Sequence, residues 1–299
     1  MHRAEIAAFL NQKGGVGKTT SVVNIGAGLT ILGKKVLIVD LDAQGHLTTF
    51  LGIEADEYTN TVYDVLRGRV EPQDAFVKKP LGARFTINGE ESQLSMTVMP
   101  SNLDLAGADM TLANGPERES LLKKAMNKIR GDFDYILIDC PPSLSLLSTN
   151  ALVASKKVYI PVQTEYLALE SVENLMKTIE VIMDRLNPSL QIGGLIATRF
   201  DGRKIINRHV VESMKERFGS LLLNTMIREN IVLAESPSHG QDIFTYRPRS
   251  NGTEDYMSLC LEIMGAGSSG ERPITVERGG IINRRSTDSA SPMLETTMS

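Results

Sequence analysis

The stretch Asn11-Gln12-Lys13-Gly14-Gly15-Val16-Gly17-Lys18-Thr19-Thr20 decides how this 299-residue sequence is interpreted. It places two lysines five residues apart in a glycine-rich turn. Glycines let successive backbone N–H groups converge on an anion, and a helix that begins just after the turn adds free N–H groups and its positive dipole end. The stretch therefore predicts a cradle for nucleotide phosphates, with Lys18 on the β and γ phosphates and Thr19 on Mg²⁺.

The flanks of this stretch predict a strand, a turn and a helix. Residues 6–10 are an apolar run suited to a buried strand, and residues 21–32 are apolar at helical spacing until Gly33. Residues 35–40 (KVLIVD) then form the next predicted strand. A strand–helix–strand unit with the phosphate turn after its first strand is typical of a parallel sheet with right-handed crossovers.

Strand and helix patterns alternate along the rest of the chain. The predicted helices cover residues 61–66, 117–130, 148–154, 170–186, 205–218 and 252–264, and the predicted strands cover 96–99, 135–139, 158–162, 192–197 and 221–227. The polar segment 78–93 is interpreted as a loop or hairpin. The alternation predicts an α/β fold, a doubly wound, mostly parallel sheet with helices on both faces.

Composition predicts one domain and a tail. With 41% hydrophobic residues, the chain can bury one large core over residues 1–264, whereas residues 265–299, rich in Gly, Ser, Thr and Arg, have the composition of a flexible tail. The net charge of −4 argues against a uniformly basic coat. Two distant cysteines, no charged and apolar leader and no run of about 18 apolar residues favour a cytoplasmic location without a membrane span.

Acidic residues at the ends of two predicted strands complete the site. Asp40 and Asp42 close the second strand, and a period of two puts both side chains on one face if the strand continues through Leu41. Asp139 ends the apolar run YILID. A buried acid is costly unless it is paired or close to an ion, and the hydration shell of Mg²⁺ supplies that compensation. We therefore predict that Asp139 positions the metal.

Lys13 separates this stretch from the ordinary P-loop. The pattern GxxxxGK[ST] requires glycine at position 12, where this chain has Gln12. Lys13 followed by GGVGKTT closely resembles the deviant Walker A motif of the ParA/MinD family of ATPases. The resemblance implies that Lys13 reaches across a dimer interface to the partner's nucleotide. It implies ATP and Mg²⁺ as cofactors.

The same resemblance assigns roles to the acids. It implies that Asp42 orients the attacking water and that Asp40 supports Mg²⁺ or its waters. Asp139 and the two prolines after Cys140 match the Walker B strand and the switch region that senses the γ-phosphate. The expected catalytic residues are Lys13, Lys18 and Asp42; the expected nucleotide-binding residues are Lys13, Gly14, Gly15, Val16, Gly17, Lys18, Thr19 and Thr20; and the expected metal residues are Thr19, Asp40 and Asp139.

Further segments resemble the ParA/Soj branch, which partitions plasmids and chromosomes. They lie at 100–109, 160–172, 198–219 and 234–243, so the likeness covers roughly residues 1–264. It implies an ATP-dependent homodimer that binds DNA non-specifically in the cytoplasm, in association with the nucleoid. It also implies release when a ParB-like centromere-binding partner stimulates hydrolysis.

A local basic segment is the predicted DNA-binding surface. Residues 199–228 hold seven basic and three acidic residues, a local charge of +4. Phosphate contacts supply most non-specific affinity for DNA. Val232 stands where relatives carry a DNA-contacting arginine, and Arg228 replaces their proline, which predicts a shifted or weakened patch. The expected DNA-binding residues are Arg203, Lys204, Arg208 and Arg228.

Other functions remain open from the sequence. Residues 198–201 (TRFD) resemble the TKxD guanine reader of GTPases but lack its lysine. A MinD-like ATPase that cycles on a membrane needs a C-terminal amphipathic helix with a basic face, which the mixed charges of the tail do not supply. An iron–sulfur reductase relative needs paired ligand cysteines. A scaffold that only binds nucleotide is disfavoured by Asp42, and a protein-positioning ATPase stays the main alternative.

Overall fold

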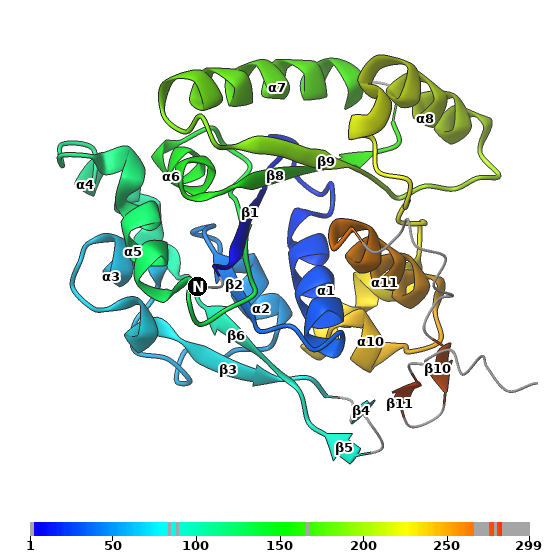
Figure 1. The fold of residues 1–299 in the computed structure, drawn as a ribbon, viewed down its shortest axis with the longest axis horizontal. Helices are drawn as coiled ribbons and strands as arrows, with labels where there is room; N and C mark the ends of the chain where they lie inside the picture. Colours follow the sequence, from blue (N-terminus) through cyan, green and yellow to red (C-terminus); the bar gives the residue numbers. More distant parts are fainter. Residues whose placement is uncertain are drawn as a thin grey trace, which may run out of the picture.

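The computed structural model describes residues 3–82, 85–87, 90–165, 168–265, 275–277 and 280–282. Its centre is a seven-stranded sheet in the order β3-β6-β2-β7-β1-β8-β9 (Figure 1). All neighbouring strands are parallel except β3, which pairs antiparallel with β6 at one edge. The strands are β1 (Glu5–Phe9), β2 (Val36–Asp40), β3 (Val77–Pro80), β6 (Ser95–Met99), β7 (Tyr135–Asp139), β8 (Lys157–Gln163) and β9 (Gln191–Thr198).

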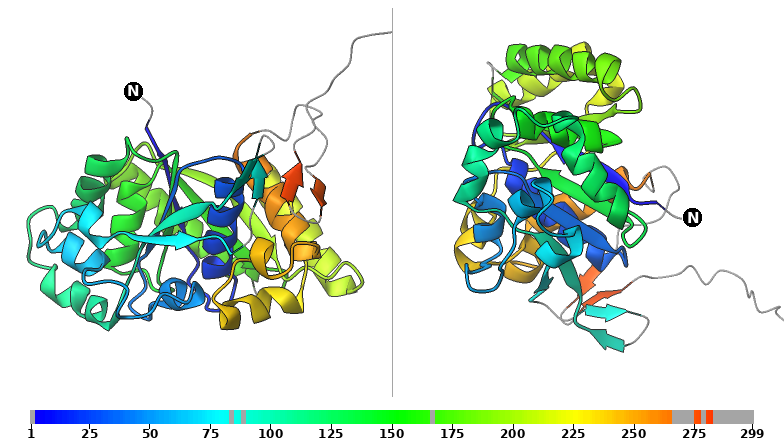
Figure 2. Two further views of the ribbon diagram at one scale, coloured as in Figure 1. Left: turned by 90° about the horizontal axis from the view of Figure 1, so that it is seen from below. Right: turned by 90° about the vertical axis from the view of Figure 1, so that its left-hand side faces the viewer.

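Helices cover both faces of the sheet, which confirms the predicted doubly wound architecture (Figures 1 and 2). In β1, alternate side chains enter different cores: Ile6 and Ala8 join one hydrophobic cluster, and Ala7 and Phe9 the other. The helices are α1 (Lys18–Ile31), α2 (His46–Phe50), α3 (Val62–Leu66), α4 (Ala108–Thr111), α5 (Leu121–Ile129), α6 (Leu146–Ala154), α7 (Ala168–Arg185), α8 (Ile205–Phe218), α9 (Ile231–Glu235), α10 (Ile243–Tyr246) and α11 (Asn251–Ile263).

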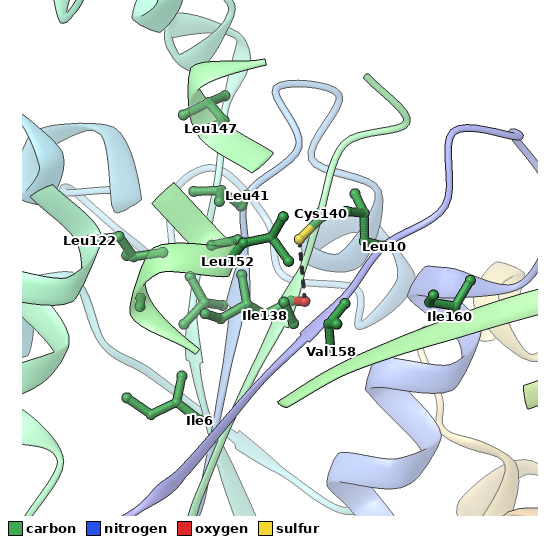
Figure 3. Packing of buried hydrophobic residues seen from close by; sticks show 14 of the residues in the cluster. Ile6, Leu10, Leu41, Leu122, Ile138, Cys140, Leu147, Leu152, Val158 and Ile160 are labelled. Atoms are coloured by element: carbon green, nitrogen blue, oxygen red, sulfur yellow. Dashed lines mark hydrogen bonds between the residues drawn. The ribbon is translucent and has the colours of Figure 1, made fainter. Parts of the chain in front are cut away.

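The first cluster packs α3, α5, α6, α7 and α8 against the sheet. Figure 3 shows part of it, with Cys140 between Leu10, which directly follows β1, and Leu152 of α6. The thiol is fully buried, and burial raises its pKa well above the ordinary value. Cys140 therefore fills space behind the site.

The second cluster surrounds α1, which lies between the sheet and α11. Glycine lets α1 approach both neighbours closely. A Cβ atom on Gly26 would lie 2.9 Å from Cγ2 of Ile38, and one on Gly28 would lie 2.6 Å from Sγ of Cys260. This packing fixes the start of α1, and with it Lys18 and Thr19, relative to the sheet.

The predicted last strand at 221–227 is wrong. This segment runs beside β9 and makes two backbone hydrogen bonds to it, from Leu223 N to Leu195 O (3.0 Å) and from Ile227 N to Ala197 O (2.8 Å). Between them, Asn224 N and Thr225 N donate to the Glu262 carboxylate of α11 at 2.7 and 2.9 Å. A side chain of a helix thus takes the donors that a strand ladder would use.

The polar segment 78–93 contains the predicted hairpin, formed by β4 (Phe85–Ile87) and β5 (Glu90–Ser92). Its first residues belong instead to the edge strand β3. In the predicted tail, β10 (Thr275–Glu277) and β11 (Gly280–Ile282) pair antiparallel, and β11 lies against β4 (Figure 2). The other residues after Gly265 lie outside the described residues, so the boundary at 264 and the tail stay predictions. Within the described ranges, every helix is too short or too polar to cross a membrane.

Candidate nucleotide and magnesium site

The glycine-rich turn connects β1 to α1 and borders an open cavity of about 760 Å³. Gly15 and Gly17 have φ angles of 73° and 90°, a region that residues with a Cβ atom rarely adopt. A cavity of this size suits a ligand as large as a nucleotide. The predicted nucleotide-binding residues that line it are Gly14, Gly15, Gly17, Lys18, Thr19 and Thr20. Val16 is buried and does not line the cavity.

Two residues that sequence analysis missed hold the turn in place. Gln163, at the end of β8, donates from Nε2 to Gly15 O at 2.8 Å, and Thr198, at the end of β9, donates from Oγ1 to Val16 O at 2.9 Å. Both side chains are buried. The available signal was a polar residue at the carboxyl end of two predicted strands, where ligands bind in open parallel sheets.

Thr19 and Asp139 form the candidate metal site. Thr19 Oγ1 donates to Asp139 Oδ2 at 2.6 Å, and Lys18 lies close enough to lower the pKa of Asp139. Burial and the nearby Asp40 outweigh these effects and raise that pKa to about 8.

The other oxygen of the Asp139 carboxylate is free to accept a ligand. Asp139 Oδ1 is buried and has no hydrogen-bond partner among the described residues. Magnesium prefers hard oxygen ligands and usually keeps several waters and substrate phosphates around it. No group of three or more acidic, His or Cys side chains suited to a metal occurs within the described ranges. The Thr19 hydroxyl and the Asp139 carboxylate therefore suit a Mg²⁺ ion whose other ligands are waters and nucleotide phosphates.

Asp40 and Asp42 occupy different positions. β2 ends at Asp40, so the condition for a shared face, a strand that continues through Leu41, is not met. Asp40 is fully buried and accepts hydrogen bonds from Thr48 N (2.9 Å), Thr48 Oγ1 (2.8 Å) and Asp42 N (3.2 Å), and burial raises its pKa to about 6. Asp42 alone of the two lines the cavity. The metal role of Asp40 and the water-orienting role of Asp42 stay predictions.

Lys13 lies beside the cavity without lining it. Its Nζ atom is 2.5 Å from Oε2 of Glu165, and the two side chains are 42% and 56% exposed. The segment after β7, interpreted from the sequence as the switch, lines the cavity with Pro141, Pro142 and Ser143. The two lysines of the turn thus face different surroundings.

Three of the four predicted DNA-binding residues, Arg203, Lys204 and Arg228, are paired with acids, whereas Arg208 binds a backbone carbonyl. Arg203 is 92% exposed and donates from Nε and Nη2 to the Asp201 carboxylate at 2.9 and 3.0 Å, which lowers the pKa of Asp201 to about 2. Lys204 Nζ is 2.6 Å from Glu229 Oε2. Arg208 Nη1 donates to Gly202 O at 2.6 Å.

Arg228 differs from the other three because it faces the protein. Its Nη2 atom is 2.6 Å from Asp255 Oδ1 and 3.0 Å from Glu254 Oε2 on α11. Glu229, Glu254 and Asp255 lie outside the segment counted in the sequence, and adding them reduces its +4 to +1. The DNA-binding role of Arg203, Lys204, Arg208 and Arg228 stays a prediction.

The chain is similar to known proteins over most of its length. A family model described as an AAA domain matches residues 4–192. The sporulation initiation inhibitor protein Soj of Bacillus subtilis is 43% identical over 263 residues, which are 88% of this chain and 99% of Soj. The chromosome partitioning protein ParA of Caulobacter vibrioides is 37% identical over 261 residues, which are 87% of this chain and 93% of ParA.

A solved structure extends the likeness to three dimensions. The protein described as cobyrinic acid a,c-diamide synthase from Mycobacterium smegmatis, with bound ADP and magnesium, is 36% identical. It matches with a TM-score of 0.74 over 90% of this chain and 98% of the solved one. With relatives of this similarity along nearly their whole length, the chain belongs to the ParA/Soj family of P-loop ATPases.

Proposed function

We propose that the chain is a Mg²⁺-dependent ATPase whose ATP-bound homodimer binds DNA non-specifically and partitions a plasmid or chromosome, with hydrolysis stimulated by a ParB-like partner. The observation that carries the proposal is the division between the two lysines of the phosphate turn. Lys18 lines its own cavity, whereas Lys13 projects to the exposed side and contacts Glu165. The Lys13 ammonium lies outside the phosphate cavity of its own subunit, so it can bind the phosphates of a nucleotide in a neighbouring subunit.

The chemistry is mainly positioning and charge neutralisation. Lys18 and the N–H groups of the turn would bind the β and γ phosphates, and Thr19 with Asp139 would hold Mg²⁺. Bound Mg²⁺ neutralises charge that develops on the phosphate oxygens. Asp42, at the cavity wall, would orient the attacking water. Lys13 of the partner subunit would complete the charge balance, so that hydrolysis and dimerisation depend on each other.

The proposed DNA surface begins at the N-terminal end of α8. Arg203 and Arg208 are exposed there, and a dimer doubles their number. The acids paired with Arg203 and Lys204 predict modest affinity with a shallow salt dependence. Arg228 contributes less, because its guanidinium is held by Asp255 and Glu254.

A DNA mobility-shift experiment tests this proposal. The purified chain is mixed with random-sequence DNA and ATP, ADP or no nucleotide, across a salt series. We expect retention with ATP alone that weakens as salt rises, and Arg203→Ala should reduce both the affinity and the salt slope. Absence of DNA retention under every condition would refute DNA segregation as the function.

A protein-positioning ATPase is the second candidate. The near-neutral charge around α8 favours it, since this surface attracts DNA less than the sequence count implied. Sedimentation with anionic liposomes and ATP separates the MinD-like form of this candidate from DNA partition. If the chain pellets with liposomes only when ATP is present and does not retain DNA, a MinD-like ATPase that acts at a membrane is the better assignment.

The name of the Mycobacterium smegmatis neighbour suggests amide synthesis instead. Amide synthesis fed by glutamine commonly uses a cysteine thiolate to release ammonia. The chain has only Cys140 and Cys260, and both are fully buried, with their thiol pKa values raised by burial. Neither offers an accessible nucleophile, so we do not propose this activity.

A further inference from the structure

We propose that Glu165 is a positioning residue that holds Lys13 within its own subunit while that subunit is unpaired, so that release of this ion pair sets the ATP concentration needed for dimerisation. The inference rests on the proposed function, in which Lys13 serves the partner's nucleotide.

The backbones around both residues are fixed to the same end of the sheet. Lys13 N donates to Asn11 Oδ1 at 3.0 Å, and Asn11 Nδ2 donates to Pro161 O of β8 at 2.7 Å. Two residues beyond Pro161, Gln163 is bonded to the phosphate turn, and Glu165 N donates to Gln163 O at 2.8 Å. The two side chains are therefore the parts of this arrangement that are free to move.

Glu165 competes with the nucleotide of the neighbouring subunit for the ammonium group of Lys13. One ammonium cannot be held by this carboxylate in its own subunit and also neutralise a triphosphate in the neighbour. Since both side chains are about half exposed, the ion pair is weak and a more highly charged anion can displace it. The pair can hold Lys13 in the single subunit without preventing dimerisation once ATP is bound.

The size of the effect follows from exposed ion pairs in general. Such a pair changes an equilibrium by roughly 1.4- to 5-fold. A dimer contains two of them, so removal of the carboxylate charge should strengthen dimerisation by roughly 2- to 30-fold. High salt screens exposed charges, so the difference should shrink near about 1 M salt.

The test compares Glu165→Gln with the wild-type chain. Sedimentation velocity measures dimer formation across a series of a non-hydrolysable ATP analogue with Mg²⁺. Glu173→Gln is the matched control, because Glu173 lies on α7 in an exposed ion pair with Arg217 at 2.8 Å, away from the turn. We expect Glu165→Gln to dimerise at lower concentration, Glu165→Asp to stay near the wild type, and Glu173→Gln to equal it.

A double-mutant cycle shows whether the effect acts through Lys13. In a Lys13→Ala background, Glu165→Gln should change nothing further. Unchanged dimerisation of Glu165→Gln, or an equal gain with and without Lys13, would overturn the inference while leaving the proposed function intact. A wild-type chain that never dimerises with the analogue would instead refute the proposed function, and the inference with it.

Discussion

Replacement of Asp139 by asparagine should stabilise the nucleotide-free protein at neutral and alkaline pH. The carboxyl is buried, and its pKa rises from 3.8 to about 8 on folding. The folded chain therefore binds this proton more tightly than the unfolded chain does. Stability from this group is greatest below about pH 4, falls as pH rises and levels off above about pH 8.

The magnitude follows from the same pKa values. Between pH 6 and pH 8 the unfolded carboxyl is ionised throughout, while the folded one is still losing its proton. Integration over that interval gives a loss of about 2 kcal/mol in the free energy of unfolding. The amide of the Asp139→Asn variant has no such titration, and its oxygen can still accept the hydrogen bond from Thr19. The stability difference between variant and wild type should thus widen by about 2 kcal/mol over the same interval.

Urea unfolding followed by circular dichroism measures this difference at pH 6 and pH 8, in EDTA and without nucleotide. Glu173→Gln serves as the control and should follow the wild type. With ATP, addition of Mg²⁺ should raise the melting temperature of the wild type but hardly that of Asp139→Asn, because the carboxylate that fits the metal is gone. A variant that keeps the wild-type dependence on pH would refute the reasoning.

Three further predictions concern the site and the core. Lys18→Ala should abolish ATP binding in a calorimetric titration, whereas Asp42→Ala should bind ATP and dimerise but release no phosphate; normal turnover would remove Asp42 from its role. Gln163→Ala, which loses the bond to Gly15 O, should weaken ATP binding roughly fivefold. Gly28→Ala should lower the free energy of unfolding by about 1–3 kcal/mol, because its Cβ atom would meet Cys260 and Phe244, while Gly131→Ala, in open space, should not.

The sequence predicted those parts of the fold that depend on local patterns. Apolar runs and a glycine-rich turn indicated the parallel sheet and the position of Lys18 and Thr19, because these signals are contained within a few residues. The segment 221–227 has a strand pattern, yet Glu262 binds its backbone donors, and no local pattern reports a partner so distant. The charge near α8 was overestimated for the same reason, since Asp255 meets Arg228 only after folding.

In the candidate site, too, local sequence patterns did not report contacts between distant segments. The place of Asp139 at the end of an apolar run predicted that it lies beside Thr19, which it contacts, whereas Gln163 and Thr198 were missed although they hold the turn directly. A common face for Asp40 and Asp42 was predicted on the condition that the strand continues through Leu41, and β2 ends at Asp40 as the apolar run indicated. Asp40 instead binds Thr48 and closes the turn into α2.

The bonds from Gln163 and Thr198 to the phosphate turn have a consequence for protein synthesis. The glycine-rich motif is synthesised before β8 and β9, the last two strands of the central sheet to be made, yet Gln163 and Thr198 at the ends of these strands hold it in place. A nascent chain cannot form both of these hydrogen bonds until Thr198 has emerged. Prematurely terminated fragments should therefore neither retain ATP nor sequester full-length subunits.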